Sequence, residues 1–148
     1  MTRPITSLAV MMLSEEGKLR LDDAPSELIP AFSTQRIFLD TDNPVMEHTR
    51  SREGEITIQH LLTHTSGLRN RNSDIYRTEG VRSRFISLKQ MVDNAARVPP
   101  FEDPGTRFRC GISTTVLGRV IEIASGQPLD RFLSDRISDP LDMKYTVF

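Results

Sequence analysis

The sequence His64-Thr65-Ser66-Gly67 places an imidazole two residues from a hydroxyl group. This is the pair of groups that many hydrolases use for nucleophilic catalysis, in which the imidazole accepts the serine proton. Side chains two residues apart need not face each other, and Ser66 lacks the Gly-x-Ser-x-Gly turn that exposes a nucleophilic serine. Gly67 is also typical of the end of a helix. We therefore expect a structural role for Ser66.

Two other groupings could bind a metal ion or exchange a proton. His60 and His64 are spaced i, i+4, which would place both imidazoles on one face of a helix. They have no companion pair of cysteines and no His-Glu-x-x-His pattern, so we expect a helix surface or helix end and no metal site. Glu15 and Glu16 are adjacent, and adjacent helical side chains point apart. We expect them to lie at a solvated helix end.

Cys110 is the only cysteine in the sequence, so no internal disulfide is possible. A cysteine becomes a strong nucleophile when a nearby cation or helix N-terminus lowers its thiol pKa. Arg107 and Arg109 are close enough in sequence to supply such a cation. An ordinary buried or solvent-facing cysteine is the commoner situation, and the residue types alone leave both alternatives open.

The composition is that of an ordinary soluble domain. The chain has 148 residues, of which 37% are hydrophobic and 26% are charged, and this is one-domain length. The net charge is −1, and Asp74 and Glu79 interrupt the arginines between Arg69 and Arg84. A nucleic-acid surface requires a coherent basic face, so we expect no nucleic-acid partner.

No segment approaches the length of a membrane span, and we expect none. The apolar run from Leu8 to Leu13 is short, and it is followed by acidic residues without a cleavage site of small residues. It therefore does not resemble a signal peptide, and a cytoplasmic chain is expected.

The candidate residues require helices to position them, and the first is predicted over Thr2 to Glu16. Thr2 can cap it, Pro4 is tolerated in its first turn, and Gly17 can adopt a positive φ at its end. Apolar side chains cover nearly every side of this segment: Ile5, Leu8, Ala9, Val10, Met11, Met12 and Leu13. A helix that is apolar all round belongs inside a core, so we expect other chain to cover it.

Four further helices are predicted from caps and apolar spacing. The first follows Thr57 and ends near Thr65. The second begins with a capping box between Ser87 and Gln90 and ends before Pro99.

The third is capped by Ser113 or Thr114 and ended by Gly126, and the fourth is opened by Pro128. The apolar face of the fourth is Leu129, Phe132, Leu133 and Ile137. Arg36 to Asp40 is a predicted short strand, whereas residues 41–54 and 69–84 are polar and predict loops.

Three segments in order carry a family signature: Thr2–Asp23, Ile56–Leu68 and Pro104–Phe148. They resemble the serine β-lactamase-related family, which includes class C β-lactamases, DD-peptidases and esterases of the same fold. The resemblance implies an antiparallel sheet flanked by helices, with the active site between the sheet and a helical region. We expect a mainly α chain, α+β at most. Residues 1–148 would form a single partial domain that corresponds to the helical region and lacks most of the antiparallel sheet.

The resemblance also implies a mechanism and a class of substrate. The nucleophile of the family is the serine of a Ser-x-x-Lys motif at the start of a buried helix, and the lysine one turn later helps remove its proton. A tyrosine of a Tyr-x-Asn motif completes the proton relay, and a Lys-Thr-Gly-like motif helps form the substrate site. No cofactor is implied. The expected substrates of an intact member are small β-lactams, peptides or esters.

The sequence departs from this pattern at the positions that carry the chemistry. Aligned on Thr2 to Thr6, Arg3 stands at the lysine position and the serine would fall one residue before Met1. A guanidinium stays protonated and cannot act as a base. Cys110 stands at the tyrosine position, and Ile112 stands at the asparagine position, where it cannot hydrogen-bond a substrate. No Lys-Thr-Gly-like motif follows.

Three hypotheses remain open from the sequence. The chain is part of a β-lactamase-related serine hydrolase that is inactive as written, since several members of the relay are replaced. Alternatively, it is an active serine hydrolase or esterase whose flanking sequence lies outside these residues. The third alternative is a non-catalytic binding module that uses exposed apolar surface to contact a partner.

Overall fold

The computed structural model describes residues 2–70, 72–81 and 85–146, with the side chain of Thr2 excepted. Its α-helices are α1 (Thr2–Glu15), α2 (Pro25–Leu28), α3 (Ile58–Leu62), α4 (Asp74–Thr78), α5 (Leu88–Arg97), α6 (Ser113–Ser125) and α7 (Leu129–Leu133). A 3-10 turn (Pro30–Phe32) follows α2, and a π turn (Ser134–Ser138) follows α7. The prediction of a mainly helical chain is confirmed for these residues.

The two strands that the structure describes form one small antiparallel sheet. They are β1 (Ile37–Phe38) and β2 (Thr49–Arg50), with Ile37 opposite Arg50 and Phe38 opposite Thr49. The strand predicted at residues 36–40 is therefore present. Its partner β2 lies in a stretch predicted as loop, because its two residues carry no alternating apolar pattern that could identify it.

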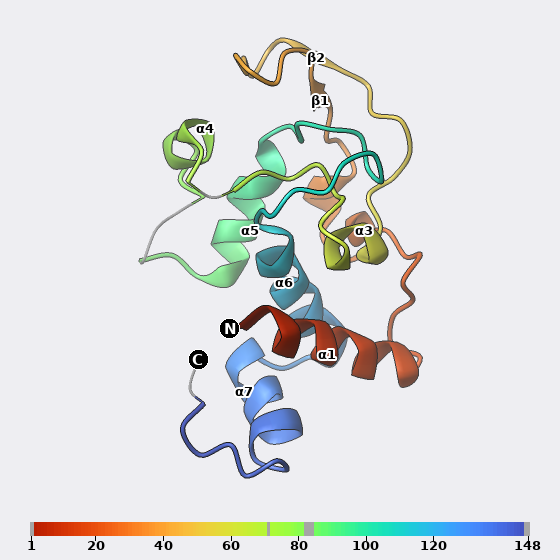
Figure 1. Cartoon of the computed structure of the whole chain (residues 1–148), viewed down its shortest axis with the longest axis vertical. Helices are drawn as coiled ribbons and strands as arrows, with labels where there is room; N and C mark the ends of the chain where they lie inside the picture. The colour runs from red at the N-terminus through yellow and green to blue at the C-terminus, as the bar shows by residue number, and fades with distance from the viewer. Residues whose placement is uncertain (1, 71, 82–84, 147–148) are drawn as a thin grey trace.

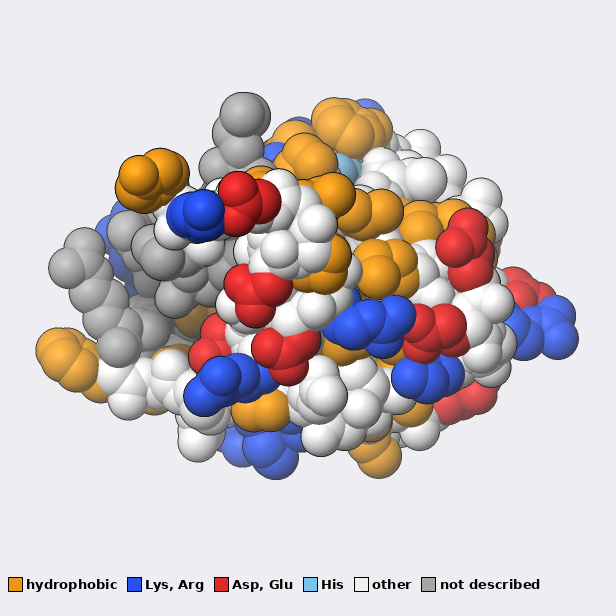
Figure 2. Space-filling view, turned by 90° about the horizontal axis from the view of Figure 1, so that it is seen from below, with side chains coloured by type: hydrophobic (Ala, Val, Ile, Leu, Met, Phe, Trp, Pro, Cys, Tyr) orange, Lys and Arg blue, Asp and Glu red, His pale blue; other side chains and the backbone are white. Residues whose placement is uncertain are grey.

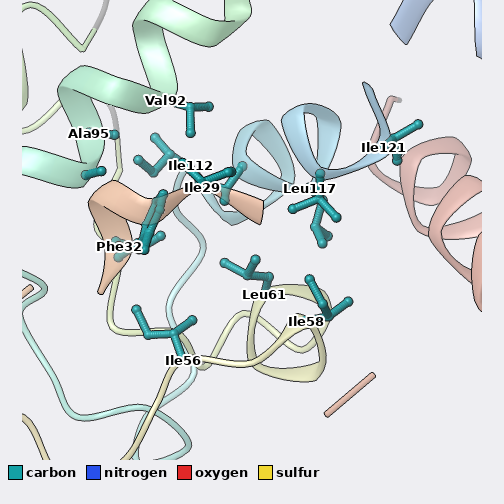
Figure 3. Packing of buried hydrophobic residues seen from close by; sticks show 14 of the residues in the cluster. Ile29, Phe32, Ile56, Ile58, Leu61, Val92, Ala95, Ile112, Leu117 and Ile121 are labelled. Atoms are coloured by element: carbon teal, nitrogen blue, oxygen red, sulfur yellow. The ribbon is translucent and has the colours of Figure 1, made fainter. Parts of the chain in front are cut away.

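Helix α6 is the centre of the described structure and packs against α1, α2, α3, α5 and α7 (Figure 1). Its core-facing residues are fully buried: Val116, Leu117, Val120 and Ile121. Figure 3 shows Leu117 close to Ile58 and Leu61 of α3. The helix ends as predicted, because Gly126 has a φ of 71° and donates its N–H to the carbonyl oxygen of Glu122.

Helix α1 buries only part of its apolar surface. Ala9, Val10 and Leu13 are fully buried, whereas Leu8 is 46% exposed and Met11 is 41% exposed. The helix packs against α6 and α7 on its buried side. The sequence predicted that additional chain would cover this helix, and in the described residues one side of it remains open to solvent.

Two predicted helix starts differ in detail from the observed ones, and one observed helix was not predicted. Ser87 accepts the N–H of Gln90, but the Gln90 side chain bonds to Asn94, so only half of the predicted capping box forms. Ser113 is the first residue of α6 and does not cap it; the residue at the cap position is Ile112, without a side-chain hydrogen bond. Helix α4 lies in a stretch predicted as loop.

Charges of both signs alternate on the face seen in Figure 2, with hydrophobic side chains between them. This distribution agrees with a net charge near zero and gives this face no coherent basic surface. Among the described residues, no helix combines the length and the apolar composition that crossing a bilayer requires.

Leu13 and Leu8 test which side of α1 belongs to the core. We expect Leu13→Ala to lower the free energy of unfolding by about 2–5 kcal/mol, because it leaves a cavity at a fully buried position. Leu8→Ala in the same helix is the matched control and should cost less than about 1 kcal/mol. Urea denaturation followed by circular dichroism measures both. Equal costs for the two variants would show that Leu8 is covered in the folded protein.

Candidate functional site

The N-terminal ends of α1 and α6 lie with Asn70 and Asn72 around a pocket of about 840 Å³. The described residues that line it are Arg3, Pro4, Thr6, Asn70, Asn72, Leu88, Gly111, Ile112, Thr114, Thr115, Gly118 and Leu129. Arg3 and Ile112 are therefore brought together, as a shared site requires. Cys110 is exposed and is not among these lining residues.

The wall beside Arg3 is fixed by a close approach of two backbone segments. A Cβ on Gly111 would overlap the carbonyl oxygen of Leu68 and lie 2.7 Å from that of Arg69. The N–H of Ile112 donates to the same Arg69 oxygen at 3.1 Å. The segment that leads to Asn70 is thus held directly against the start of α6, and only glycine fits at position 111.

Ile112 faces mainly into the core. It is 3% exposed, and Figure 3 shows it between Ile29 and Val92. Its apolar side chain also lines the pocket and offers no hydrogen bond there. The isoleucine therefore serves hydrophobic packing at a position where the family resemblance implies a polar side chain.

Ser66 is a buried structural residue. Its side-chain oxygen lies 2.9 Å from that of Ser113, and its relative exposure is 1%. This bond joins the segment after α3 to the first turn of α6, and it uses the Ser113 hydroxyl that the sequence suggested as a helix cap. The structural role predicted for Ser66 agrees with this geometry.

His60 and His64 do not share a helix face, and the suggestion from their spacing is wrong. Helix α3 ends at Leu62, and His64 has a φ of 57°. His60 instead accepts the N–H of Thr57 at its Nδ1, while Thr57 Oγ1 accepts the N–H of His60. The two residues thus form a reciprocal cap. The described residues contain no group of three or more His, Cys, Asp or Glu side chains placed to hold a metal ion.

The pKa of His64 lies below its usual 6.5, because burial disfavours the imidazolium and, secondly, because the charge of Arg3 repels it. Its Nδ1 is buried and has no hydrogen-bond partner among the described residues. The ring lies edge-on to Phe108, with the centroids 6.0 Å apart. His64 is therefore neutral near pH 7 and lies within the electrostatic reach of Arg3.

Arg109 is engaged by a carboxylate. Its Nε donates to Glu102 at 3.0 Å, and Arg69 approaches the same oxygen at 3.5 Å while its guanidinium lies 4.5 Å above the ring of Phe101. The sequence proposed Arg109 as a cation that could activate Cys110. The Arg109 guanidinium is therefore held in an ion pair with a carboxylate that Arg69 shares, and it is not a free cation dedicated to the Cys110 thiol.

Several pocket residues were not predicted from the sequence. Asn70 and Asn72 lie in a stretch predicted as loop, and Leu88 lies in the helix predicted to begin at the Ser87 cap. Thr114 was considered as a cap and not as a lining residue. The available signal was Gly111, whose position beside Cys110 could have indicated a close backbone approach.

The comparisons with known proteins agree with this architecture. The family model described as Beta-lactamase matches residues 1–148, so the chain belongs to the Beta-lactamase family. Acyltransferase mokF of Monascus pilosus is 28% identical over 149 residues, which is 99% of this chain and 36% of that protein. Esterase EstB of Burkholderia gladioli is 31% identical over 97% of this chain and 36% of its own length.

Solved structures give the same placement. EstCE1, a hydrolase with promiscuous acyltransferase activity, superposes with a TM-score of 0.78 at 29% identity, over 95% of this chain and 36% of that one. Simvastatin synthase from Aspergillus terreus gives 0.71 at 28% identity, over 95% of this chain and 35% of that one. The chain thus spans about a third of the length of these relatives.

Substitution of Gly67 tests the close approach of its backbone to that of Glu102. Gly67→Ala should destabilise the fold by about 3 kcal/mol or more, because φ is +79° and a Cβ would overlap the carbonyl oxygen of Glu102. Gly17→Ala is the matched control, since φ is +69° but no atom lies within 4 Å of the added Cβ. We expect the control to cost about 1 kcal/mol. Thermal and urea unfolding give both values, and a Gly67 variant as stable as the control would contradict this packing.

His64 should titrate below pH 6.5 in the folded chain, and Arg3→Gln should raise its pKa without restoring the usual value, because burial is the larger cause. The unfolded chain takes up this proton first, so the contribution to stability is complete above about pH 6.5 and decreases as the pH falls through that value. Histidine ring NMR titrations measure the shift, with Arg20→Gln as a charge-matched control. A His64 pKa at or above 6.5, or one unaffected by Arg3→Gln, would contradict the geometry.

Proposed function

We propose that residues 1–148 are the helical part of a β-lactamase-family domain and lack most of its antiparallel sheet. We further propose that their pocket binds small acyl compounds without the lysine- and tyrosine-assisted acyl transfer of the family. In this proposal Arg3 takes the lysine position, Cys110 the tyrosine position and Ile112 the asparagine position. The coverage of about a third of the relatives' length supports the assignment to part of a domain.

The observation that carries the proposal is the presence of Arg3 in the pocket. A guanidinium remains protonated at any working pH, so it cannot remove a proton from a nucleophile. Ile112 has no polar atom in its side chain, and Cys110 does not line the pocket. A site with these groups retains binding surface and lacks the proton relay of the family.

A second candidate function is active ester or acyl transfer by a longer protein that contains these residues. The names of the relatives favour it, because they include an acyltransferase, a methylbutanoyltransferase and an esterase. It would require a base other than Arg3. His64 is one candidate, because its imidazole feels the charge of Arg3, although it is not among the described lining residues.

Intact-mass labelling separates the two functions. The purified protein, and any longer natural product that contains these residues, is incubated with a fluorophosphonate or with a penicillin. We expect no serine adduct, since Arg3 cannot accept a proton and Cys110 does not line the pocket. Esterase EstB treated in parallel is the positive control.

A stoichiometric adduct on a serine would overturn the proposed function and favour the active enzyme. Cys110→Ser separates a thiol adduct from a serine adduct, because it removes the single thiol of the chain. Loss of labelling in that variant would assign the reaction to the exposed cysteine and would likewise contradict the proposal.

A further inference from the structure

We propose that the pocket is an anion site in which Arg3 binds the carboxylate of a small aliphatic acid whose chain lies against Leu88 and Leu129. This inference depends on the proposed function only in taking the pocket as the ligand site of the chain. It assigns a role to Arg3, which stands at the lysine position of the family. A permanent cation suits recognition of an anion better than proton transfer.

The described lining residues carry positive charge only. Arg3 is the charged side chain among them, and they include no aspartate or glutamate. None of the ion pairs between described residues involves Arg3. The depressed pKa of His64 agrees with a guanidinium whose charge is felt by its neighbours. An anionic ligand would neutralise this charge.

Neutral polar groups lie around the same space. Asn70 comes from the segment held against Gly111, and Thr114 and Thr115 come from the first turn of α6. Amide N–H and hydroxyl groups can donate hydrogen bonds to a carboxylate oxygen without adding charge. The lining therefore combines one fixed cation with neutral donors.

Another part of the lining is apolar and tightly packed. A Cβ on Gly118 would lie 3.0 Å from Leu129 Cδ2 and 3.3 Å from Leu88 Cδ2, so both leucines converge on this glycine of α6. Leu88 begins α5 and Leu129 begins α7. Three helices thus contribute to one apolar wall, which can take up the hydrocarbon part of a ligand whose charged end is at Arg3.

A carboxylate fits this lining better than a phosphate does. The planar guanidinium presents paired N–H donors that match two oxygens of either anion, so the apolar wall decides between them. Inorganic phosphate has no apolar part, so the wall of Leu88 and Leu129 would contribute nothing to its binding. The pocket volume of about 840 Å³ lies within the range of small-molecule sites.

Hexanoate is the probe that tests this assignment, in titrations followed by calorimetry and by backbone NMR shifts. We expect saturable binding with shifts at the lining residues, and at least about a tenfold loss of affinity in Arg3→Gln, because a charge-assisted hydrogen bond is removed. Arg20→Gln removes an equal charge beyond the other end of α1 and should leave the affinity unchanged. Binding should also raise the pKa of His64, a readout that a general loss of stability would not produce.

Matched ligands and a second variant separate the two halves of the site. Hexanol lacks the charge and acetate lacks the chain, so both should bind at least about tenfold more weakly than hexanoate. Leu88→Ala should weaken hexanoate and leave acetate unaffected. Inorganic phosphate should not compete.

Absence of hexanoate binding, equal affinity in Arg3→Gln, or stronger competition by phosphate than by acetate would overturn the anion site. The labelling experiment is independent of these outcomes. A serine adduct together with Arg3-dependent hexanoate binding would refute the proposed function and leave the anion site standing, whereas neither adduct nor binding would refute the anion site alone.

Discussion

The pocket depends on backbone segments that approach each other more closely than any side chain allows. Gly67 lies against the carbonyl of Glu102, and Gly111 lies against the carbonyls of Leu68 and Arg69. The buried bond between Ser66 and Ser113 joins the same segments. These contacts hold the end of α3 to the start of α6, and the position of every lining residue near Asn70 follows from them. Since the interior is close-packed, a single added carbon at either glycine must displace backbone.

Arg3 changes the electrostatic character of the site that this framework supports. A lysine at the same place could lose its proton in an apolar setting and act as a base, whereas a guanidinium remains a fixed cation. The low pKa of His64 follows partly from that charge. In the proposed function the guanidinium at the lysine position cannot transfer a proton, and in the proposed anion site the same group supplies the positive charge beside neutral donors and an apolar wall.

Helix α1 lines the pocket at its start and exposes part of its apolar surface to solvent. Its buried side packs on α6 and α7, and its other side exposes Leu8 and Met11. The chain covers 36% of the length of curated relatives such as the acyltransferase of Monascus pilosus. Exposure of these apolar side chains to water carries a free-energy cost, which agrees with the proposal that residues 1–148 are part of a larger domain.

The sequence by itself determined the helices that have strong local signals. Gly17 and Gly126 mark helix ends because only glycine readily adopts a positive φ, and the spacing of Phe132, Leu133 and Ile137 identified a buried face. The family resemblance likewise followed from local segments, and the match over residues 1–148 confirmed it.

Only the tertiary structure decided how these elements share one site. The pairing of Ser66 with Ser113 and the place of Arg69 beside Gly111 depend on contacts between segments more than 40 residues apart, which no local pattern encodes. Likewise, the burial of Ile112 and the engagement of Arg69 by Glu102 follow from packing of distant neighbours. The side-chain types show which reactions and contacts are available. The distances between those side chains, which decide which contacts form, arise only when the helices pack.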